Sequence, residues 1–591
     1  MDETFYDVVI IGGGIAGLAA CRHLLLNIEQ LQNKRIAIIE PRTANRTNVQ
    51  EDYKVGESTI DVSSMFFAKE LRLQDYLIEN HPPKFSLQFN WPKKIDKTDT
   101  MEDYYSILSI KNPEIQTFQL NRAKIERDML KMVINQGAVY YHGRVKDVNL
   151  TPGDSIKSIT IHILSDTDDF NDQKVIDTKV IQAGYIIDAS GRNFVVGSRT
   201  NNVVKDPKEM FGLENASTWV RVKNTNRDVL NFQNHEVTAS WYYATNHFFG
   251  PGYWIWMIPL ERGSRDFSIG VSYHRDKIDP KDMNSLEKFL NFLKVNQRLV
   301  YDLIVSGEIV DCHKWPKLAH TSRVFFSPDH WCVIGDAACI FDPFYSTGMA
   351  MMAFEVECCT ELLKQKLVKK CKSSFDTRVE AYDGFIRCYT QNNCHIIKKH
   401  SNHLGNASVM SWRIYLENTI YFGTIVPMYI GKYFLCPKFC KFFLLFGREG
   451  MKLKEAILDT FDEIIQKDIN IGFIDNHRGT SAPNTSWDVD NILNLSKYGE
   501  KVLNLPTQMT WTSMMNCRTF FYIYMKAYGI KALWNSSFYK TFGVSLLSIP
   551  LTYTASWIHY FKNWNTPDNE FFDKMVADFD QYKYVSKPLP F

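Results

Sequence analysis

The sequence predicts an α/β protein built around a doubly wound, Rossmann-like sheet, with an antiparallel second sheet and a helical C-terminal region. Three observations predict this fold class. An apolar run at 5–11 leads directly into a glycine-rich stretch at 12–17, short aromatic-rich runs fill 215–275, and apolar residues at helical spacing dominate beyond about residue 351. Strands joined through helices, followed by short alternating strands, are typical of a parallel sheet with an antiparallel second layer.

The bulk composition limits the class of protein. At 591 residues the chain is too long for one ordinary core, so we expect two or three packed units. Hydrophobic residues make up 45% and charged residues 23%, which excludes extended disorder and a membrane-embedded bundle. A net charge of +2 argues against nucleic acid as the main partner. We therefore expect a small-molecule substrate.

The cysteines and the start of the chain indicate the compartment. The acidic start Met1–Phe5 runs into a strand without a secretory signal, and the twelve cysteines form no dense framework. Both features predict a cytoplasmic protein with reduced thiols. Cys436 and Cys440 lack a second ligand pair at suitable spacing, so no metal site is predicted.

The first 40 residues predict a βαβ unit. Phe5–Ile11 is a continuous apolar run of strand formers, Gly12–Gly17 predicts a tight turn, and Ile15–Leu26 is apolar at helical spacing. Arg35–Glu40 predicts a second buried strand. This order of strand, glycine turn, helix and strand is the context in which a glycine fingerprint binds a dinucleotide.

Each glycine of the fingerprint has a physical reason. Gly12, Gly14 and Gly17 occupy the positions that need a tight turn, a close approach to a pyrophosphate, and close packing of helix on strand. The helix N-terminus then offers free amides to the phosphates. Glu40 ends the next strand, where an acid accepts hydrogen bonds from a ribose. The alternative for Glu40 is an ordinary surface acid at the end of a strand.

The rest of the chain predicts two regions. Further strands are expected at 138–150, 156–164, 180–188, 235–243, 254–259, 266–273 and 331–334. We assign 1–365 to a nucleotide-binding core that includes the antiparallel sheet at 215–275. Residues 366–591 are expected to form a mostly helical region that caps the substrate pocket.

A second set of residues resembles FAD-dependent aromatic hydroxylases. That class commonly carries a stretch similar to Asp188-Ala189-Ser190-Gly191. Asp336, after a buried strand, is placed to bond the ribityl hydroxyls or the surroundings of the pyrophosphate, and the amides of Gly348 and Met349 are placed to face the isoalloxazine ring. The resemblance also puts Arg122 near the flavin, with an ordinary surface salt bridge as the alternative.

The motifs together resemble the flavin-dependent halogenases. They are the glycine loop 12–17, Gly56-Glu57-Ser58, the strand Trp254–Pro259 and the segment Asp342–Gly348, and the resemblance covers about residues 5–365. It implies that reduced FAD and O2 oxidise chloride to hypohalous acid. This acid must then reach the substrate without direct hydroxylation of the substrate by the flavin.

Two tryptophans fit this requirement. Trp254 and Trp256 alternate along a strand, so their side chains share one face, and Pro259 ends the strand. The resemblance makes them a rigid wall that screens the flavin from the substrate. The alternative is that both are ordinary aromatic residues of the sheet core.

The resemblance also assigns the lysine and the halide site. The essential lysine of the family matches Lys84, and burial in a dry tunnel would lower its pKa. The alternative is a solvated surface lysine, and Lys54 and Lys69 are weaker candidates. Chloride is expected at the amides of Thr347 and Gly348, where a helix begins.

One departure from the family bears on the substrate. Tryptophan halogenases carry a glutamate immediately before Ser-Thr-Gly, and this sequence has Tyr345 there. Phenol-directed members that act on polyketide aromatics tolerate such a residue. We therefore expect an electron-rich phenol of polyketide type as the substrate.

Other interpretations of the sequence stay open. An FAD-dependent aromatic monooxygenase or a hydride-transferring flavoprotein would share the nucleotide site, and a non-catalytic binding protein could retain the fold. No second glycine fingerprint appears, so we expect a separate flavin reductase to supply reduced FAD. The segments 428–447 and 545–557 mix polar and apolar residues, which leaves peripheral membrane contact open beside simple packing in the helical cap.

Overall fold

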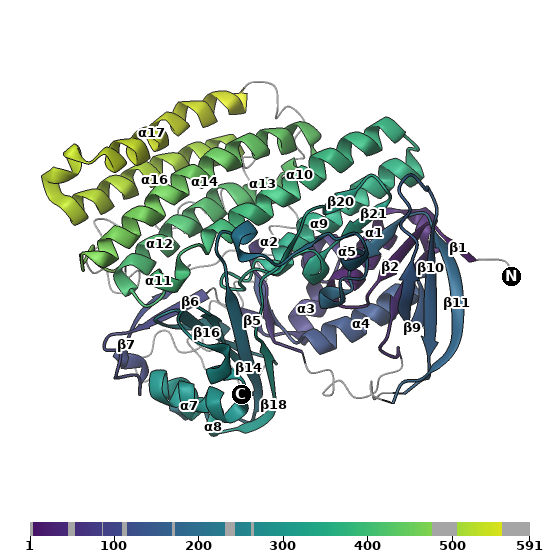
Figure 1. Cartoon of the computed structure of the whole chain (residues 1–591), viewed down its shortest axis with the longest axis horizontal. Coiled ribbons are helices and arrows are strands. Elements are labelled where there is room, and N and C mark those ends of the chain that lie inside the picture. The colour runs from purple at the N-terminus through teal and green to yellow at the C-terminus, as the bar shows by residue number, and fades with distance from the viewer. Residues whose placement is uncertain are drawn as a thin grey trace.

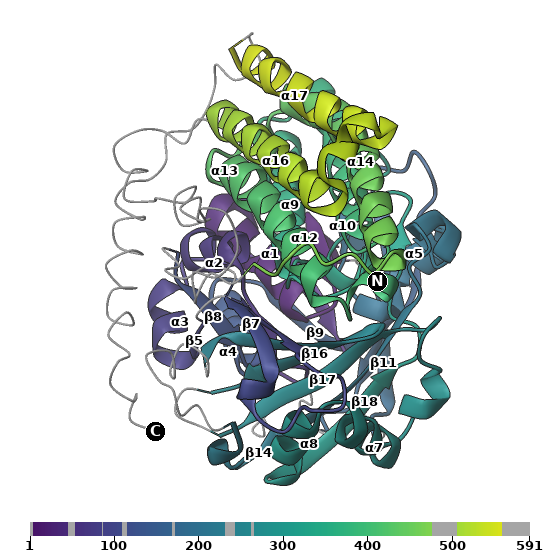
Figure 2. The same ribbon diagram turned by 90° about the vertical axis from the view of Figure 1, so that its left-hand side faces the viewer.

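A computed structural model describes residues 4–44, 54–84, 87–108, 115–167, 172–230, 243–261, 265–474 and 505–557. Within them two large sheets lie side by side, and a layer of long helices from the C-terminal part of the chain lies across both (Figures 1 and 2). The predicted mixed α/β class is confirmed.

The first sheet contains nine strands in the order β1-β11-β10-β9-β3-β2-β12-β21-β20. Their bounds are β1 Thr4–Tyr6, β2 Val8–Ile11, β3 Ile36–Glu40, β9 Val139–Val148, β10 Lys157–Leu164, β11 Val175–Ala183, β12 Ile186–Asp188, β20 Phe326–Ser327 and β21 Trp331–Val333. Its central strands β9, β3, β2, β12 and β21 are parallel, as the βαβ pattern predicts. Helix α1 (Ile15–Asn27) packs against α4 (Arg122–Asn135) and α9 (Gly348–Leu363).

Two predicted strands are each divided in the structure. The run 5–11 breaks at Asp7, whose carboxylate pairs with Arg35 (Oδ2–Nε 2.8 Å), so β1 pairs with β11 while β2 pairs with β3 and β12. The run 180–188 breaks at Gly184, whose amide donates to the Tyr6 carbonyl. Its first part is the end of β11, at the edge of the sheet, and its second part is β12 in the centre.

The second sheet has the order β18-β14-β17-β16-β15-β6-β7. Its strands are β6 Leu87–Pro92, β7 Tyr104–Leu108, β14 Asn215–Lys223, β15 Thr245–Gly250, β16 Tyr253–Pro259, β17 Phe267–His274 and β18 Glu308–Trp315. The sheet is therefore wider than the predicted 215–275, and it is antiparallel except where β15 pairs with β6. The predicted strand 235–243 lies outside the described residues, apart from Tyr243. Helices α7 (Leu286–Asn296) and α8 (Arg298–Val305) bury residues in a common core with this sheet.

A small third sheet brings distant segments together beside the large ones. It joins β4 (Glu57–Ser58), β8 (Thr117–Leu120) and β5 (Pro83–Lys84), with β8 in the middle. Helix α2 (Asp61–Met65) follows β4 after two residues. This arrangement places Lys84 near the segment that carries Gly56-Glu57-Ser58.

The C-terminal part of the described chain is helical, as predicted. Its principal helices are α10 Lys372–Ile396, α11 His400–His403, α12 Ala407–Ile420, the π-helix η11 Tyr421–Ile425, α13 Val426–Ile430, α14 Pro437–Gln466, α16 Leu505–Tyr528 and α17 Ser536–Trp557. Helix α10 packs on α9 and β20, which joins the layer to the first sheet. In the described part of the chain no helix is both long and apolar enough to span a bilayer. Leu546 and Leu547 of α17 are exposed, and peripheral membrane contact stays a prediction.

Candidate active site

The glycine loop is tight on one side and open on the other. Gly12 has a φ of +108°, and a Cβ on it would lie 2.3 Å from the Ala189 carbonyl oxygen. A Cβ on Gly17 would lie 2.0 Å from the Gly12 oxygen. On Gly14 a Cβ would meet nothing nearer than Glu126 Oε1 at 3.9 Å. The loop therefore excludes side chains where it packs and leaves room at Gly14, which fits a pyrophosphate.

Glu40 is buried against this loop. The side chain is only 7% exposed, unlike a surface acid, and its Oε2 accepts a hydrogen bond from the Gly13 amide at 2.6 Å. Burial raises the pKa of Glu40. The charge of Arg42 and the hydrogen bond from the Gly13 amide lower it by more, so the net pKa lies below its usual value. Arg42, which pairs with Glu40, was not predicted, although a basic residue two positions after the acid that ends the strand was a usable signal.

A first cavity is lined by one face of the second sheet and by the segment that follows β21, and we call it the flavin-side cavity because the residues predicted to lie near the flavin line it. Arg122 of α4 and Asp336 line it together with Glu57 and Ser58 of β4. Arg122 pairs with Glu57 and with Glu126 (Nη2–Oε1 2.8 Å), and its side chain is only 15% exposed, so these are not the surface salt bridge considered as the alternative. Its place near the flavin stays a prediction. Burial raises the pKa of Asp336, and Arg122 partly offsets that rise. The side chain of Met349 packs in the core, and its backbone amide lies in the first turn of α9.

The two tryptophans face this cavity as one surface. The ring centroids of Trp254 and Trp256 lie 5.8 Å apart, both rings line the flavin-side cavity, and β16 ends at Pro259. A Cβ on Gly270 of the neighbouring strand would lie 2.3 Å from the Trp256 ring, so glycine makes room for that indole. The ring of Trp254 packs edge-on against Phe344, with ring centroids 5.5 Å apart.

Asp342 fixes the segment 342–348 against this tryptophan strand. Its Oδ1 accepts hydrogen bonds from Trp254 Nε1 and the Phe344 amide, both at 3.0 Å. Its Oδ2 accepts from Asn215 Nδ2 at 3.0 Å and from Ser272 Oγ at 3.1 Å. Burial raises the pKa of Asp342 to about 6, and these hydrogen bonds oppose the rise. One carboxylate therefore sets the position of the residues predicted to hold the halide.

Lys84 lies in a second, mostly apolar cavity of about 260 Å³. Its side chain is 1% exposed, and its Nζ donates to the Thr59 carbonyl at 2.6 Å. Burial lowers the pKa of Lys84 to about 7, while Asp61 acts in the opposite direction. The alternative of a solvated lysine is therefore wrong. Lys54 lies elsewhere, paired with Glu126, and Lys69 lines neither cavity.

The two cavities meet at Thr347. Its side chain lines both of them, whereas Gly348 lines the flavin side and Tyr345 the Lys84 side. Phe344 packs edge-on against Tyr345, with ring centroids 4.4 Å apart, and neither tryptophan lines the Lys84 cavity. The structure thus brings the predicted halide segment, the tryptophan strand and Lys84 together at one boundary.

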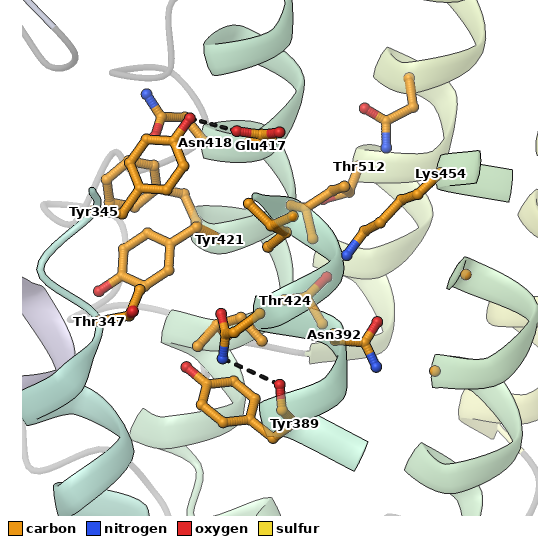
Figure 3. Close-up of a pocket in the computed structure, with 18 of the residues that line it drawn as sticks. Tyr345, Thr347, Tyr389, Asn392, Glu417, Asn418, Tyr421, Thr424, Lys454 and Thr512 are labelled. Carbon is orange, nitrogen blue, oxygen red and sulfur yellow. Dashed lines mark hydrogen bonds between the residues drawn. The ribbon is translucent and has the colours of Figure 1, made fainter. Parts of the chain in front are cut away.

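Four residues that line this second cavity were not predicted from the sequence: Asp61, Glu417, Tyr421 and Lys454. Tyr345 donates a hydrogen bond to Glu417 of α12, which places a carboxylate beside the position where the expected glutamate is absent (Figure 3). Asp61 lies in the same cavity and is hydrogen-bonded to Tyr421, and burial raises its pKa to about 6. Lys454 of α14 is the fourth. Asp61 follows Ser58 closely enough to be noticed, but nothing in the helical sequence singles out Glu417 or Lys454.

Comparisons with known proteins identify the family. The tryptophan halogenase family model matches residues 109–393. The flavin-dependent halogenase chlA of Dictyostelium discoideum is 59% identical over 587 residues, covering 98% of this chain and 97% of that protein. The 1H-pyrrole-2-carbonyl-[peptidyl-carrier protein] chlorinase of Pseudomonas fluorescens is 25% identical over 59% of this chain and 74% of its own length.

Solved structures share the fold at low identity. The halogenase PltM superposes with a TM-score of 0.56 at 14% identity, covering 86% of this chain and 96% of that one. The flavin-dependent halogenase CmlS superposes with a TM-score of 0.52 at 18% identity, covering 68% of this chain and 66% of that one. These solved structures show the fold, and the near-full-length relative at 59% identity shows an FAD-dependent enzyme. The near-full-length similarity to chlA then shows that this chain belongs to the flavin-dependent halogenases, which use FADH2, O2 and chloride.

Asp342 gives a direct test of this geometry. In Asp342→Asn one of the two acceptor oxygens becomes an amide donor that faces other donors. We expect the free energy of unfolding to fall by about 2 kcal/mol or more, because buried donors lose their acceptor. Urea denaturation of the FAD-loaded protein measures this change. Ser272→Ala is the matched control, since it removes a single donor and should cost about 1 kcal/mol. Equal losses in the two variants would contradict the central position of Asp342.

Proposed function

We propose that this halogenase chlorinates an electron-rich phenolic small molecule of polyketide type, using hypochlorous acid that Lys84 holds. The observation that carries the proposal is the position of Lys84, buried in an apolar cavity that meets the flavin-side cavity at Thr347. Aromatic substrates suit a cavity with apolar walls and a few polar groups. Tyr345, at the position where tryptophan halogenases have a glutamate, supports a phenol over tryptophan.

The residues of the first cavity fit FAD. Gly12, Gly14 and Gly17 would accommodate the pyrophosphate, Glu40 the adenosine ribose, and Arg122 and Asp336 the flavin end. With O2, reduced FAD supplies the oxidising equivalent that turns chloride into hypochlorous acid. Chloride would be held by the amides of Thr347 and Gly348, where α9 begins and where a Cβ on Gly348 would meet no atom within 4 Å.

In this proposal the first cavity screens the flavin from the substrate, and the second cavity is where chlorine is transferred to the substrate. Trp254 and Trp256 form one wall of the flavin side, and Phe344 with Tyr345 separates that wall from the substrate. Lys84, anchored on the Thr59 carbonyl, receives the electrophilic chlorine at its Nζ. The hydroxide of the hypochlorous acid leaves with an amine proton of Lys84 as water. When an aromatic carbon then takes the chlorine from Nζ, the displaced ring proton returns to the lysine nitrogen.

Reduced FAD must come from outside this site. The sequence has one glycine fingerprint, and that fingerprint forms the loop assigned to FAD. We infer that a separate flavin reductase supplies FADH2.

A chloride-dependent product assay tests the proposed function. We expect the enzyme, given FADH2, O2, chloride and a polyhydroxyphenyl ketone, to form a product with the isotope doublet of chlorine in its mass spectrum. Phloroglucinol, the ligand in one solved PltM complex, provides a second probe. A hydroxylated product that forms without halide would instead support an aromatic monooxygenase.

Lys84→Ala separates the lysine step from flavin chemistry. We expect this variant to bind FAD and consume O2 normally while its chlorination rate falls by about 100-fold or more, the order of loss when a group that stabilises the reacting atoms is removed. Product mass spectrometry and an oxygen electrode measure the two rates. Lys69→Ala, which lines neither cavity, should retain both. Normal chlorination by Lys84→Ala would remove this residue from the mechanism.

The pKa of Lys84 gives a pH dependence with a defined sign. If the neutral amine receives the chlorine, chlorination should rise as the pH passes through about 7 and then level off. Asp61 is ionised above its own pKa of about 6 and raises the pKa of Lys84, whereas His247, with a pKa of about 3, stays neutral throughout. Asp61→Asn removes the negative charge, so the rising limb should move to lower pH, by up to about one unit.

Two measurements report this shift. The pH profile of single-turnover chlorination gives the position of its rising limb. The pH dependence of acetylation at Lys84, followed by peptide mass spectrometry, gives the pKa of the amine itself. Glu79→Gln, outside both cavities, is the control. A limb that stays in place or moves to higher pH in Asp61→Asn would contradict the assignment.

A further inference from the structure

The substrate cavity has a second polar end that the steps above do not use. Lys454 of α14 reaches into the cavity from the side opposite Tyr345 and Thr347 (Figure 3). Lysine is costly to bury without a partner, because its ammonium loses hydration. The ammonium of Lys454 at this end of the cavity therefore needs a physical reason.

Among the described residues no carboxylate accepts a hydrogen bond from Lys454. The acid that couples to it electrostatically is Glu417, but the two oxygens of Glu417 already accept hydrogen bonds from Arg413 Nε at 2.8 Å and from Tyr345. Burial lowers the pKa of Lys454 to about 8, and Glu417 opposes that shift. The side chain thus stays an ammonium donor at neutral pH, with no hydrogen-bond acceptor in the described part of the protein.

Two neighbouring groups on α16 are also unsatisfied. Thr512 Oγ1 and Asn516 Oδ1 are buried, line the same cavity, and have no hydrogen-bond partner among the described residues. A Cβ on Gly423 would lie 1.7 Å from the Thr512 hydroxyl, so the glycine is what allows this hydroxyl to lie there. Buried polar groups are normally paired in proteins, so these two unpaired atoms, which line the same cavity as the half-buried Lys454, indicate a ligand.

The cavity wall near these groups is apolar. Phe443, Phe446, Leu453 and Ile457 of α14 line it. An aromatic or alkyl body fits between such walls, with its polar atoms directed to the two ends.

We propose that Lys454, Thr512 and Asn516 form a subsite for an oxygen atom on a substituent of the substrate, remote from the carbon that is chlorinated. The ammonium of Lys454 and the hydroxyl of Thr512 donate to a carbonyl or carboxylate oxygen, and Asn516 Oδ1 accepts from a hydroxyl group beside it. The inference rests on the proposed phenolic substrate and extends it to phenols that carry an oxygenated side group. Anchoring that oxygen fixes which ring carbon faces Lys84, so the subsite determines the position of chlorination.

Equilibrium binding to the FAD-loaded enzyme tests the subsite without turnover. Three probes share one hydroxylated ring: an alkyl ketone, the same molecule with a methylene in place of the carbonyl, and the corresponding carboxylic acid. We expect the wild type to bind the ketone or the acid about tenfold more tightly than the methylene compound, and the comparison of those two shows which oxygen is preferred. Lys454→Met should abolish that preference and leave the affinity for the methylene compound unchanged.

Controls separate the subsite from a general effect on folding. Lys441→Met removes the same charge from an exposed position of α14 and should bind all three probes as the wild type does. Thr512→Val, a change of similar volume, should reduce the preference in part. In turnover, Lys454→Met should give a broader mixture of chlorinated positional isomers.

The outcomes distinguish this inference from the proposed function. A wild type that binds none of the probes, or all three equally, overturns the subsite even if it chlorinates phenols. A Lys454→Met variant that weakens all three probes equally, or none, also overturns it. If the wild type shows the preference and Lys454→Met loses it, but no phenol is chlorinated, the subsite stands and the proposed reaction fails.

Discussion

The carboxylate of Asp342 is the constraint on which the arrangement of the site depends. It accepts hydrogen bonds from side chains on β14, β16 and β17 and from the backbone of its own segment. These four hydrogen bonds fix the position of the segment 342–348 relative to the second sheet. Because α9 begins at Gly348 and packs on the helices of the first sheet, the same segment also joins the two sheets. Thr347 consequently lies where the two cavities meet.

Under the proposed function, this boundary would direct the oxidant from one cavity to the other. The flavin side is lined by indoles and by charged groups, among them the ion pair of Arg122 and Glu57, whereas the Lys84 side is largely apolar. Burial in that apolar cavity brings the pKa of Lys84 near 7, so the amine is close to balance between its charged and neutral forms. A lysine in water would be charged and a poor acceptor of electrophilic chlorine. The helical layer supplies the rest of the cavity that holds Lys84, including Glu417 and Lys454.

The parts that sequence predicts well are those with a local cause. The glycine loop, the strand at 254–259 and the start of the helix at Gly348 follow from backbone geometry and side-chain alternation, and the structure places each as expected. The lysine, the halide site and the tryptophan wall came from resemblance. The structure brings these residues together but leaves their roles as proposals.

The parts that were missed depend on contacts between distant segments. The breaks at Asp7 and Gly184 arise from pairing with Arg35 and Tyr6, which strand periodicity does not encode. The parallel pairing of β6 with β15 widens the second sheet in a way that neither segment signals alone. Glu417, Lys454 and Thr512 lie on helices rich in other polar residues, and only their common orientation toward one cavity distinguishes them.

The central claim is that electrophilic chlorine passes from the flavin-side cavity to Lys84 within the protein. Chlorination by the wild type in a large excess of free methionine, which consumes hypochlorous acid in solution, tests this claim most directly. The account predicts that the yield of chlorinated phenol per FADH2 changes little, because the oxidant does not enter bulk water. A yield that falls in proportion to the methionine concentration would contradict the account.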